Sequence, residues 1–265
     1  FDNWSYDFNR QLVGELSGAK FHIIPAGRKP FLPWAASVFW EKFYRLTGAL
    51  IPLPPALRSK GISRRSGLLV KEIKKLKGNR YHLVVGHNPG ALYPSFYAAQ
   101  MFNAKSGFDV EDYHPGEGDN PREQKLTKSL MNELLPKMDY VSFASPLMKK
   151  KHIEDAGLEG KNWQVVLNFF PAKDFIFSEP AINNSAILQL VWFSQNINYK
   201  RGLEQVIPAL DNFKDKIVLT LIGNMKEAFY KEYIEPRPHI NVIPPQEQKA
   251  LHQLMVNFDV GLAIE

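Results

Sequence analysis

Residues 81–117 constrain the fold more than any other part of this 265-residue chain. An apolar run at 83–85 ends at a polar turn, 86–90, and a helix-compatible segment follows it. A second segment that reads as a strand, 104–110, then leads into an acidic loop. This succession predicts two parallel strands joined by a helix. Ligands bind beyond the carboxyl ends of the strands in such sheets, so we expect the polar turn and the loop to share one functional edge.

The same alternation continues to the end of the chain. Strands are predicted at 140–144, 164–167, 187–193, 217–222, 240–243 and 260–264. Helices are predicted at 122–135, 146–157, 202–213, 226–233 and 246–257. Because the strands are apolar throughout, the pattern indicates α/β domains whose parallel sheets are covered on both faces. Residues 169–185 lack a period and contain two prolines, which indicates a connection between domains. We therefore expect domains at 1–170 and 186–265 with a linker at 171–185.

The N-terminal part carries two further patterns. Residues 3–16 have helical spacing and residues 20–25 read as a strand, so a preceding strand is expected to be missing. Residues 31–57 are rich in aromatic side chains, and residues 58–80 are rich in Lys and Arg. An aromatic segment beside a cationic helix suits an anionic membrane surface, through 31–80. The alternative is that the aromatic residues are core and the cations form a solvated helix face.

The composition of the chain excludes several kinds of bond, binding site and partner. The chain has no cysteine, which rules out disulfide bonds and thiolate metal sites. It has no charge-free stretch of about 18 apolar residues, so we expect no transmembrane helix. No signal peptide is visible at the first residues. The net charge of +6 favours an anionic partner. Because the cations gather in one region without a recognition motif, we expect no nucleic acid.

The polar turn and the acidic loop hold the first candidate site residues. His87 can position or deprotonate a hydroxyl, since an imidazole titrates near neutral pH, and Asn88 stands beside it. The alternative is that both residues cap the following helix. In the loop, Glu111, Asp112 and His114 can supply a general base. They can also form a merely polar turn, and one loop has no recognisable metal spacing.

A second candidate site lies at the junction SQNINYKRG, which follows the strand predicted at 187–193. Lys200 and Arg201 can neutralise a diphosphate, assisted by the start of the next helix. The alternative is two surface cations at a helix start. Gly223 ends the next strand, where a glycine permits close approach of a ligand.

These segments, in this order, resemble the retaining glycosyltransferases of family 4, which have the GT-B architecture. VVGHNPGALYPSFYAAQ is similar to a strand end and helix of that family, and SGFDVEDYHPGE to its next strand and loop. LVWFSQNINYKRGLEQVIPAL is similar to the opening of its donor domain. The likeness spans about 81–265. It implies two Rossmann-like domains with parallel sheets, the second incomplete.

The resemblance places His87 on the acceptor side. Glu111 falls where the family usually has a loop histidine, and Asp112 stands in place of its glutamate. These three residues are the expected catalytic group, with Asn88 and His114 as acceptor-binding residues.

On the donor side, Arg201 falls at the family's phosphate-contacting lysine, and Asn196 stands where its partner arginine is found. Asn196, Lys200, Arg201 and Gly223 are the expected donor-binding residues. The family's first strand would precede Phe1, and its donor-gripping glutamate pair would follow Glu265. We therefore expect a chain truncated at both ends and inactive as given.

The resemblance implies transfer of a sugar from a nucleotide-diphosphate sugar to a hydroxyl acceptor, with retention, in surface polysaccharide or glycolipid synthesis. It implies no metal and no cofactor besides the donor substrate. It also implies a cytoplasmic location, including a peripheral one at the inner face of the membrane. Two alternatives stay open. One is a nucleotide-sugar epimerase, and the other is a non-catalytic nucleotide- or sugar-binding protein, which Asn196 in place of arginine favours.

Overall fold

A computed structural model of the protein describes residues 30–117, 120–169 and 185–264, together with Lys20, His22, Ile24 and Arg28. The chain divides into two compact units, Phe1–Asn168 and Phe169–Glu265. The helix predicted at 3–16 lies outside the described residues, as do half of the residues of the strand predicted at 20–25 and nearly all of the linker predicted at 171–185.

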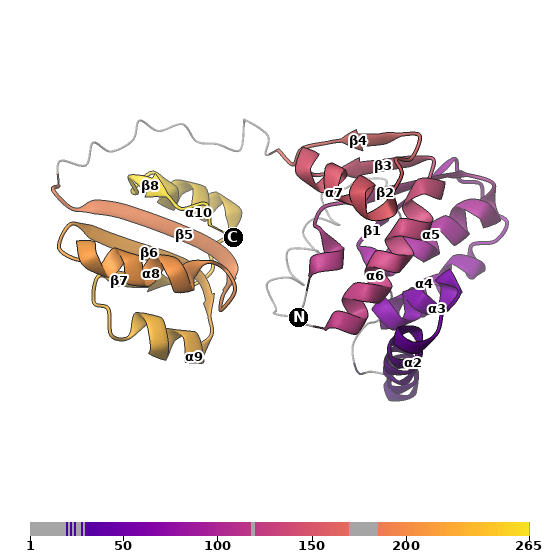
Figure 1. The fold of residues 1–265 in the computed structure, drawn as a ribbon, viewed down its shortest axis with the longest axis horizontal. Coiled ribbons are helices and arrows are strands. Elements are labelled where there is room, and N and C mark those ends of the chain that lie inside the picture. Colours follow the sequence, from indigo (N-terminus) through magenta and orange to yellow (C-terminus); the bar gives the residue numbers. More distant parts are fainter. Residues whose placement is uncertain are drawn as a thin grey trace. The chain divides into compact units, whose positions relative to one another are not determined.

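The first unit is built on a four-stranded sheet of order β1-β2-β3-β4, in which every described pair is parallel (Figure 1). Helices connect successive strands, as the alternation predicted. The strands are β1 Leu83–His87, β2 Lys105–Val110, β3 Tyr140–Phe143 and β4 Trp163–Val165, and the helices between them are α5 Pro89–Phe102, α6 Pro121–Leu134 and α7 Pro146–Ala156. Short 3-10 turns lie at His114–Gly116 and Leu135–Lys137.

Local sequence sets the helix ends. Ser145 caps α7 by accepting a hydrogen bond from the Met148 amide at 3.1 Å, and Gly157 ends the helix with φ of 69°. Both ends were predicted from the sequence and are confirmed. Asn88 precedes α5 with φ of 66°, but its side chain makes no capping hydrogen bond. Asn88 therefore occupies the N-cap position of α5, as the alternative interpretation expected, but its side chain does not cap the helix.

The core of the first unit lies between the sheet and its helices. Apolar residues from β2 and β3 meet those of α5 and α6, which buries these two strands. Its largest fully buried members are Leu92, Phe108, Leu126, Leu130, Met131, Leu134, Leu135 and Phe143. The prediction of a sheet covered on both faces is wrong for β1, an edge strand of the described sheet, where Leu83 and Val85 are exposed.

Three helices precede this sheet: α2 Phe31–Leu50, α3 Pro55–Ile62 and α4 Arg64–Lys75. The alternative that the aromatic residues of 31–57 form a core is wrong for several of them, because Phe39, Trp40 and Phe43 are exposed. In the described part of the chain no helix combines the length and the apolarity that a membrane span needs.

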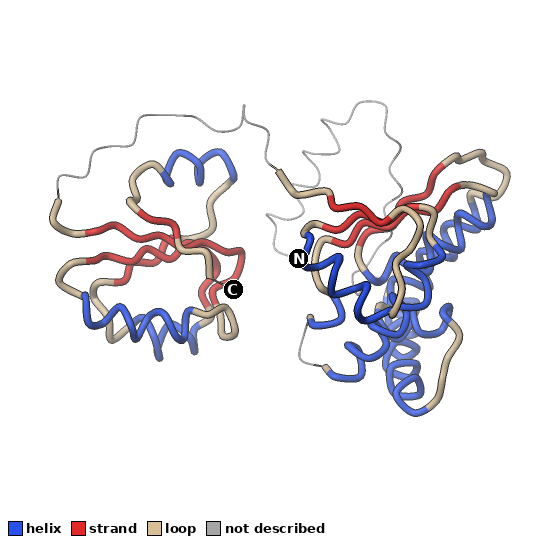
Figure 2. Tube along the Cα trace, turned by 45° about the horizontal axis from the view of Figure 1, so that its top comes forward, coloured by secondary structure: helices blue, strands red, loops and turns tan. Residues whose placement is uncertain are grey.

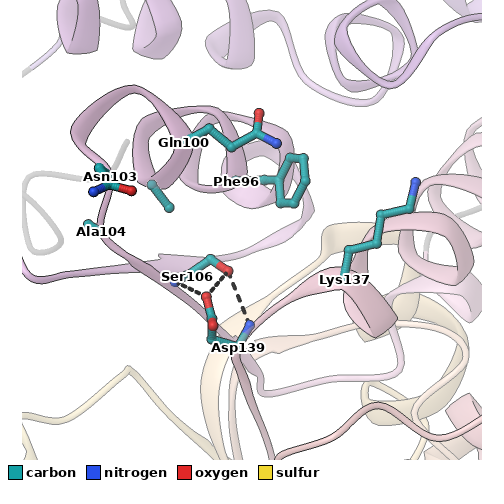
Figure 3. A pocket seen from close by; sticks show the side chains of 8 residues that line it. Phe96, Gln100, Asn103, Ala104, Ser106, Lys137 and Asp139 are labelled. Carbon is teal, nitrogen blue, oxygen red and sulfur yellow. Dashed lines mark hydrogen bonds between the residues drawn. The ribbon is translucent and has the colours of Figure 1, made fainter.

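At the amino-terminal edge of the first sheet, a carboxylate links β2 to the start of β3. Asp139, just before β3, accepts hydrogen bonds from the Ser106 amide and hydroxyl at 2.9 and 3.0 Å (Figure 3). Its other oxygen accepts from the Lys105 ammonium at 2.9 Å. The backbone hydrogen bond from Ser106, followed by that from Lys105, lowers the pKa of Asp139 to about 2. A hollow of about 350 Å³ beside this pair lies at the edge away from the strand ends that bind ligands.

The second unit has a parallel sheet of order β7-β6-β5-β8. Its strands are β5 Leu188–Ile197, β6 Ile217–Met225, β7 Ile240–Ile243 and β8 Val260–Gly261; its helices are α8 Leu203–Leu210, α9 Glu227–Phe229 with a following turn at Tyr230–Ile234, and α10 Gln248–Met255. Figure 2 shows the strands of each unit in red and its helices in blue. The strand order reverses between β5 and β8. Such a switch point is where open parallel sheets bind ligands.

Strand β5 is longer than predicted. Its pairing with β6 is irregular between Phe193 and Asn196 and then resumes, so that Asn196 pairs with Asn224. The prediction that the strand ends at Phe193 is therefore wrong, because a bulge carries the chain onward. The core of this unit is its own; its largest fully buried members are Ile197, Leu203, Ile207 and Phe229.

Candidate functional site

The carboxyl edge of the first sheet brings one histidine between two carboxylates. In the parallel register His87 lies beside Asp109, and Glu111 follows the end of β2. His87 Nε2 lies 3.1 Å from Glu111 Oε1, and His87 Nδ1 lies 3.3 Å from Asp109 Oδ2. Both ring nitrogens therefore face an acceptor, which holds the imidazole in one orientation. The adjacency of His87 and the acidic loop was predicted from the strand order.

Sequence reasoning missed Asp109. Its Oδ1 accepts a hydrogen bond from the Ser142 hydroxyl at 2.6 Å, across from β2 to β3. Ser142 is buried, so this hydrogen bond holds the Asp109 carboxylate in position. The available signal was a carboxylate next to the last residue of the predicted strand; its register with His87 is seen only in the structure.

This group remains open to solvent. The His87 side chain is 49% exposed and that of Glu111 is 42% exposed. A hydroxyl can therefore approach the ring edge, and an imidazole or carboxylate there can accept its proton. His87, Asp109 and Glu111 each offer one potential metal-ligand atom, and these three atoms lie within 4.8 Å of one another, a spacing that can also hold a metal ion. In the structure each ring nitrogen of His87 faces a carboxylate. The expectation that the reaction needs no metal stays a prediction.

The remaining acidic-loop residues lie in different environments. Asp112 is exposed, whereas His114 is 5% exposed and its Nδ1 lies 2.7 Å from Glu117 Oε2. The structure therefore does not place His114 at the surface with the other predicted acceptor residues. Asn88 is exposed next to His87 at the start of α5.

A buried polar cluster supports this loop. The Tyr113 hydroxyl donates to Asp155, and burial together with this bond raises the pKa of Tyr113 to about 12. Burial alone would raise the pKa of Asp155, but hydrogen bonds from Lys128, Tyr113 and Lys151 bring it to about 2. Burial lowers the pKa of His152 to about 4, so its ring is neutral at pH 7. These contacts tie the loop to α6 and α7.

In the second unit the predicted donor residues gather at the carboxyl end of β5. Lys200 has φ of 65° and Gly202 has φ of 77°, so the chain turns sharply before α8 begins. The Arg201 guanidinium donates to the Ser194 hydroxyl at 2.9 Å, and the Lys200 amide donates to Glu204. Two cationic residues therefore lie at the switch point between β5 and β8.

Asn196 and Gly223 have structural surroundings that the sequence did not reveal. Asn196 is an exposed strand residue opposite Asn224, whose amide donates to the Gln195 carbonyl at 3.0 Å. Gly223 has φ of 155°, and a Cβ built on it would lie 2.1 Å from the Ser194 carbonyl oxygen. Only glycine fits where the two strand backbones approach this closely.

No protein-family model matches this chain, and no curated protein matches it. Solved structures do match it. HepE from Anabaena, crystallised with UDP-glucose, has a TM-score of 0.56 at 16% identity, and the match covers 73% of this chain and 55% of HepE. Sucrose-phosphate synthase from Thermosynechococcus elongatus has a TM-score of 0.60 at 14% identity, covering 74% and 54%. A glycosyltransferase from Rickettsia africae has a TM-score of 0.53 at 13% identity, covering 90% and 70%.

These neighbours are GT-B glycosyltransferases, and this chain shares their fold of two α/β units with parallel sheets. The fold prediction is confirmed. The chain spans about half the length of HepE and of the synthase.

Proposed function

We propose that this protein is a glycosyltransferase that moves a sugar from a nucleotide-diphosphate sugar to a hydroxyl acceptor. The observation that carries the proposal is the His87 ring held between Asp109 and Glu111 at the ligand-binding edge of a GT-B-type unit. The proposal is supported by the similarity of the fold to that of HepE, which was crystallised with UDP-glucose.

On the acceptor side, the reaction forms a bond between the acceptor oxygen and the anomeric carbon, and the acceptor hydroxyl loses its proton. His87 is the group that orients the hydroxyl, and His87 or Glu111 accepts the proton. Asp109 holds the ring of His87, and Ser142 holds Asp109. Asp112 and Asn88 are exposed nearby and complete the predicted acceptor group.

On the donor side, the bond between the anomeric carbon and the diphosphate breaks, and the nucleoside diphosphate leaves with the electron pair. Lys200 and Arg201 at the end of β5 are the groups proposed to stabilise that charge. Asn196 and Gly223 lie at the same strand ends. The proposal includes retention at the anomeric carbon and no metal.

The proposed setting is surface polysaccharide or glycolipid synthesis, with the protein held peripherally at the inner face of the membrane. The exposed aromatic residues of α2 and the cations of α3 and α4 motivate this location.

The test uses the full-length protein with a panel of UDP-, ADP- and GDP-sugars, with and without a mixture of hydroxyl acceptors. Donor consumption that requires an acceptor, with the product anomer retained, is the expected result. Donor isomerisation without any acceptor would instead assign an epimerase. Tight nucleotide-sugar binding with neither reaction would leave a binding protein. A His87→Ala variant tested alongside decides whether the reaction uses this site.

A further inference from the structure

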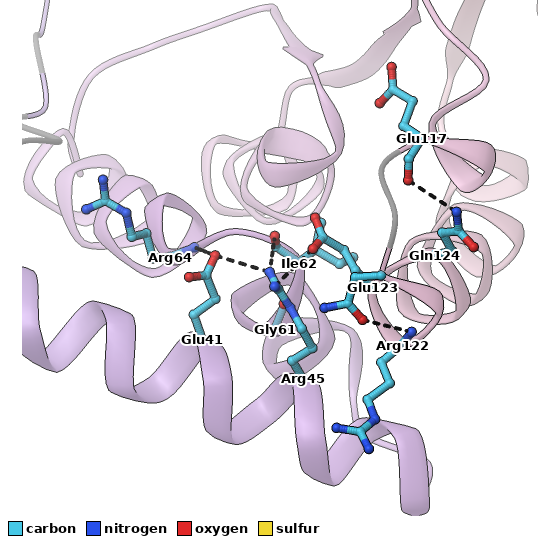
Figure 4. Close-up of polar contacts among 10 residues, drawn as sticks. Glu41, Arg45, Gly61, Ile62, Arg64, Glu117, Arg122, Glu123 and Gln124 are labelled. Carbon is cyan, nitrogen blue, oxygen red and sulfur yellow. Dashed lines mark hydrogen bonds and ion pairs between the residues drawn. The ribbon is translucent and has the colours of Figure 1, made fainter. Parts of the chain in front are cut away.

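Helix α2 directs the side chains of Glu41 and Arg45 toward the protein. Arg45 donates from Nε to the Gly61 carbonyl at 2.9 Å and forms an ion pair with Glu123 at 3.0 Å (Figure 4). Glu41 accepts from the Arg64 amide at 3.1 Å. A Cβ built on Gly48 would lie 2.7 Å from a Leu126 side-chain atom, so the helix also approaches α6 closely. These contacts fix which face of α2 points inward.

The outward face is mostly apolar, and Lys42 is an exposed cation on the same helix. Its large side chains recur at helical spacing along 20 residues, a length of about 30 Å. Neighbouring rings also contact each other, as Trp40 stacks on Tyr44 at 5.4 Å between centroids. The exposed members, which we call the α2 stripe, are Leu32 (78% exposed), Phe39 (60%), Phe43 (42%), Leu46 (48%) and Leu50 (78%). A contiguous apolar stripe on a surface marks an interaction site.

A cationic groove runs beside the stripe, between α2 and α4. It has a volume of about 560 Å³, and Trp40 and Tyr44 line one side. Lys60, Arg64 and Lys71 line the other, and no acidic residue is among the described residues that line it. The Lys60 ammonium lies 5.8 Å from the Tyr44 ring centroid. The groove thus combines aromatic faces with positive charge.

We propose that the α2 stripe and this groove together form a docking surface for an anionic lipid membrane. The stripe lies in the plane of the interface, with its rings at the boundary between headgroups and acyl chains. Lipid phosphates then occupy the groove beside Lys60 and Lys71. This deepens the proposed peripheral location by naming the surface and the lipid chemistry, but docking itself requires neither donor nor acceptor.

Charge favours a membrane over a second copy of the chain. Pairing two α2 stripes would bring two cationic grooves toward each other, whereas anionic headgroups neutralise them. Aromatic residues flanked by Lys and Arg are also the composition of helices that lie on membranes.

The experiment is co-sedimentation of the full-length protein with vesicles of phosphatidylcholine alone or mixed with phosphatidylglycerol. We expect binding to the anionic vesicles that weakens as salt rises. Lys60→Gln/Lys71→Gln should reduce that binding roughly 30-fold, because each cation near the surface contributes about a factor of five. Lys150→Gln, in α7, is the matched control and should bind as wild type.

The apolar part is tested by Phe39→Ser/Phe43→Ser, with Leu147→Ser as the control at an even more exposed apolar residue of the same unit. The stripe variant should lose vesicle binding, and the control should keep it. Circular dichroism shows whether each variant is folded, and Lys60→Gln/Lys71→Gln tests the surface independently if the stripe variant is not.

Several results would overturn the proposal. Equal binding to neutral and anionic vesicles would exclude the groove as a lipid site. Inorganic phosphate that binds wild type but not Lys60→Gln/Lys71→Gln, without any vesicle binding, would assign a free anion. A dimer in sedimentation velocity that Phe39→Ser/Phe43→Ser converts to a monomer would assign the stripe to a second copy. By contrast, an absence of sugar transfer together with intact vesicle binding would refute the proposed function and leave the docking surface standing.

Discussion

The Nε2 atom of His87 lies 3.1 Å from Oε1 of Glu111, which joins the end of one strand to the residue that follows the next. Parallel pairing of β1 and β2 places His87 in register with Asp109, two residues before Glu111, and so brings the two strand ends together. A hydroxyl that approached His87 would therefore meet a carboxylate at the same time, the arrangement that proton transfer needs.

His87→Ala and Glu111→Gln should each lower kcat/KM for sugar transfer by about 10²–10⁴-fold, the usual contribution of a general acid or base. Nucleotide affinity should stay unchanged, because both residues lie in the first unit. His82→Ala, an exposed histidine just before β1, is the control. Steady-state kinetics of the full-length protein make the measurement; wild-type rates in both variants would remove this assignment.

Arg201→Ala should weaken binding of a nucleoside diphosphate about 10–100-fold, the range for loss of one hydrogen bond to a charged group. The Ser194 hydroxyl, which Arg201 now holds, would be left to solvent. Calorimetric titration with UDP measures the effect. Lys214→Ala, an exposed cation of the same unit, should bind as wild type. Equal affinity in both variants would place the diphosphate elsewhere.

Gly223→Ala should destabilise the second unit by about 1–3 kcal/mol through backbone strain. The added Cβ would meet the Ser194 carbonyl at 2.1 Å, so β5 and β6 must separate at their ends. Gly261→Ala is the matched control in the same sheet, because a Cβ there meets nothing within 4 Å. Urea unfolding of both variants gives the comparison; equal midpoints would show that the strand ends yield freely.

Asp139 should make the first unit lose stability in acid. Its folded pKa of about 2 lies below the unfolded value of about 3.9, so the stabilising contribution is complete above pH 4 and lost as pH falls toward 2. Asp139→Asn should therefore lower the melting temperature at pH 7 and approach wild type near pH 2. Asp215→Asn, an exposed residue, is the control. A difference from wild type that did not change with pH would contradict this reasoning.

The sequence predicted the sheets well because strand-like segments alternate with helix-compatible segments along the chain. The strands at 83–87 and 105–110 and the helix between them lie where the pattern put them. From that order alone, His87 could be expected beside the acidic loop. Cap chemistry at Ser145 and Gly157 was equally readable, since each acts through its neighbours in the chain.

What the sequence did not reveal depends on pairing across space. Asp109 joins the site through register with His87 and a hydrogen bond from Ser142, and neither contact has a local signature. The bulge that carries β5 on to Ile197 is likewise a property of its pairing with β6. The sequence did not reveal which aromatic residues of helix α2 are exposed, because an aromatic pattern alone does not distinguish a buried face from an outward one.

The two hydrophobic cores have a consequence for how this chain unfolds. The core of the first unit and that of the second share no described residue, so each core can be lost on its own. A heat-capacity scan should then resolve two transitions, and one unfolding free energy for the whole chain is not defined. Asp139→Asn should move one of these transitions and Gly223→Ala the other, which would assign each peak to its sheet.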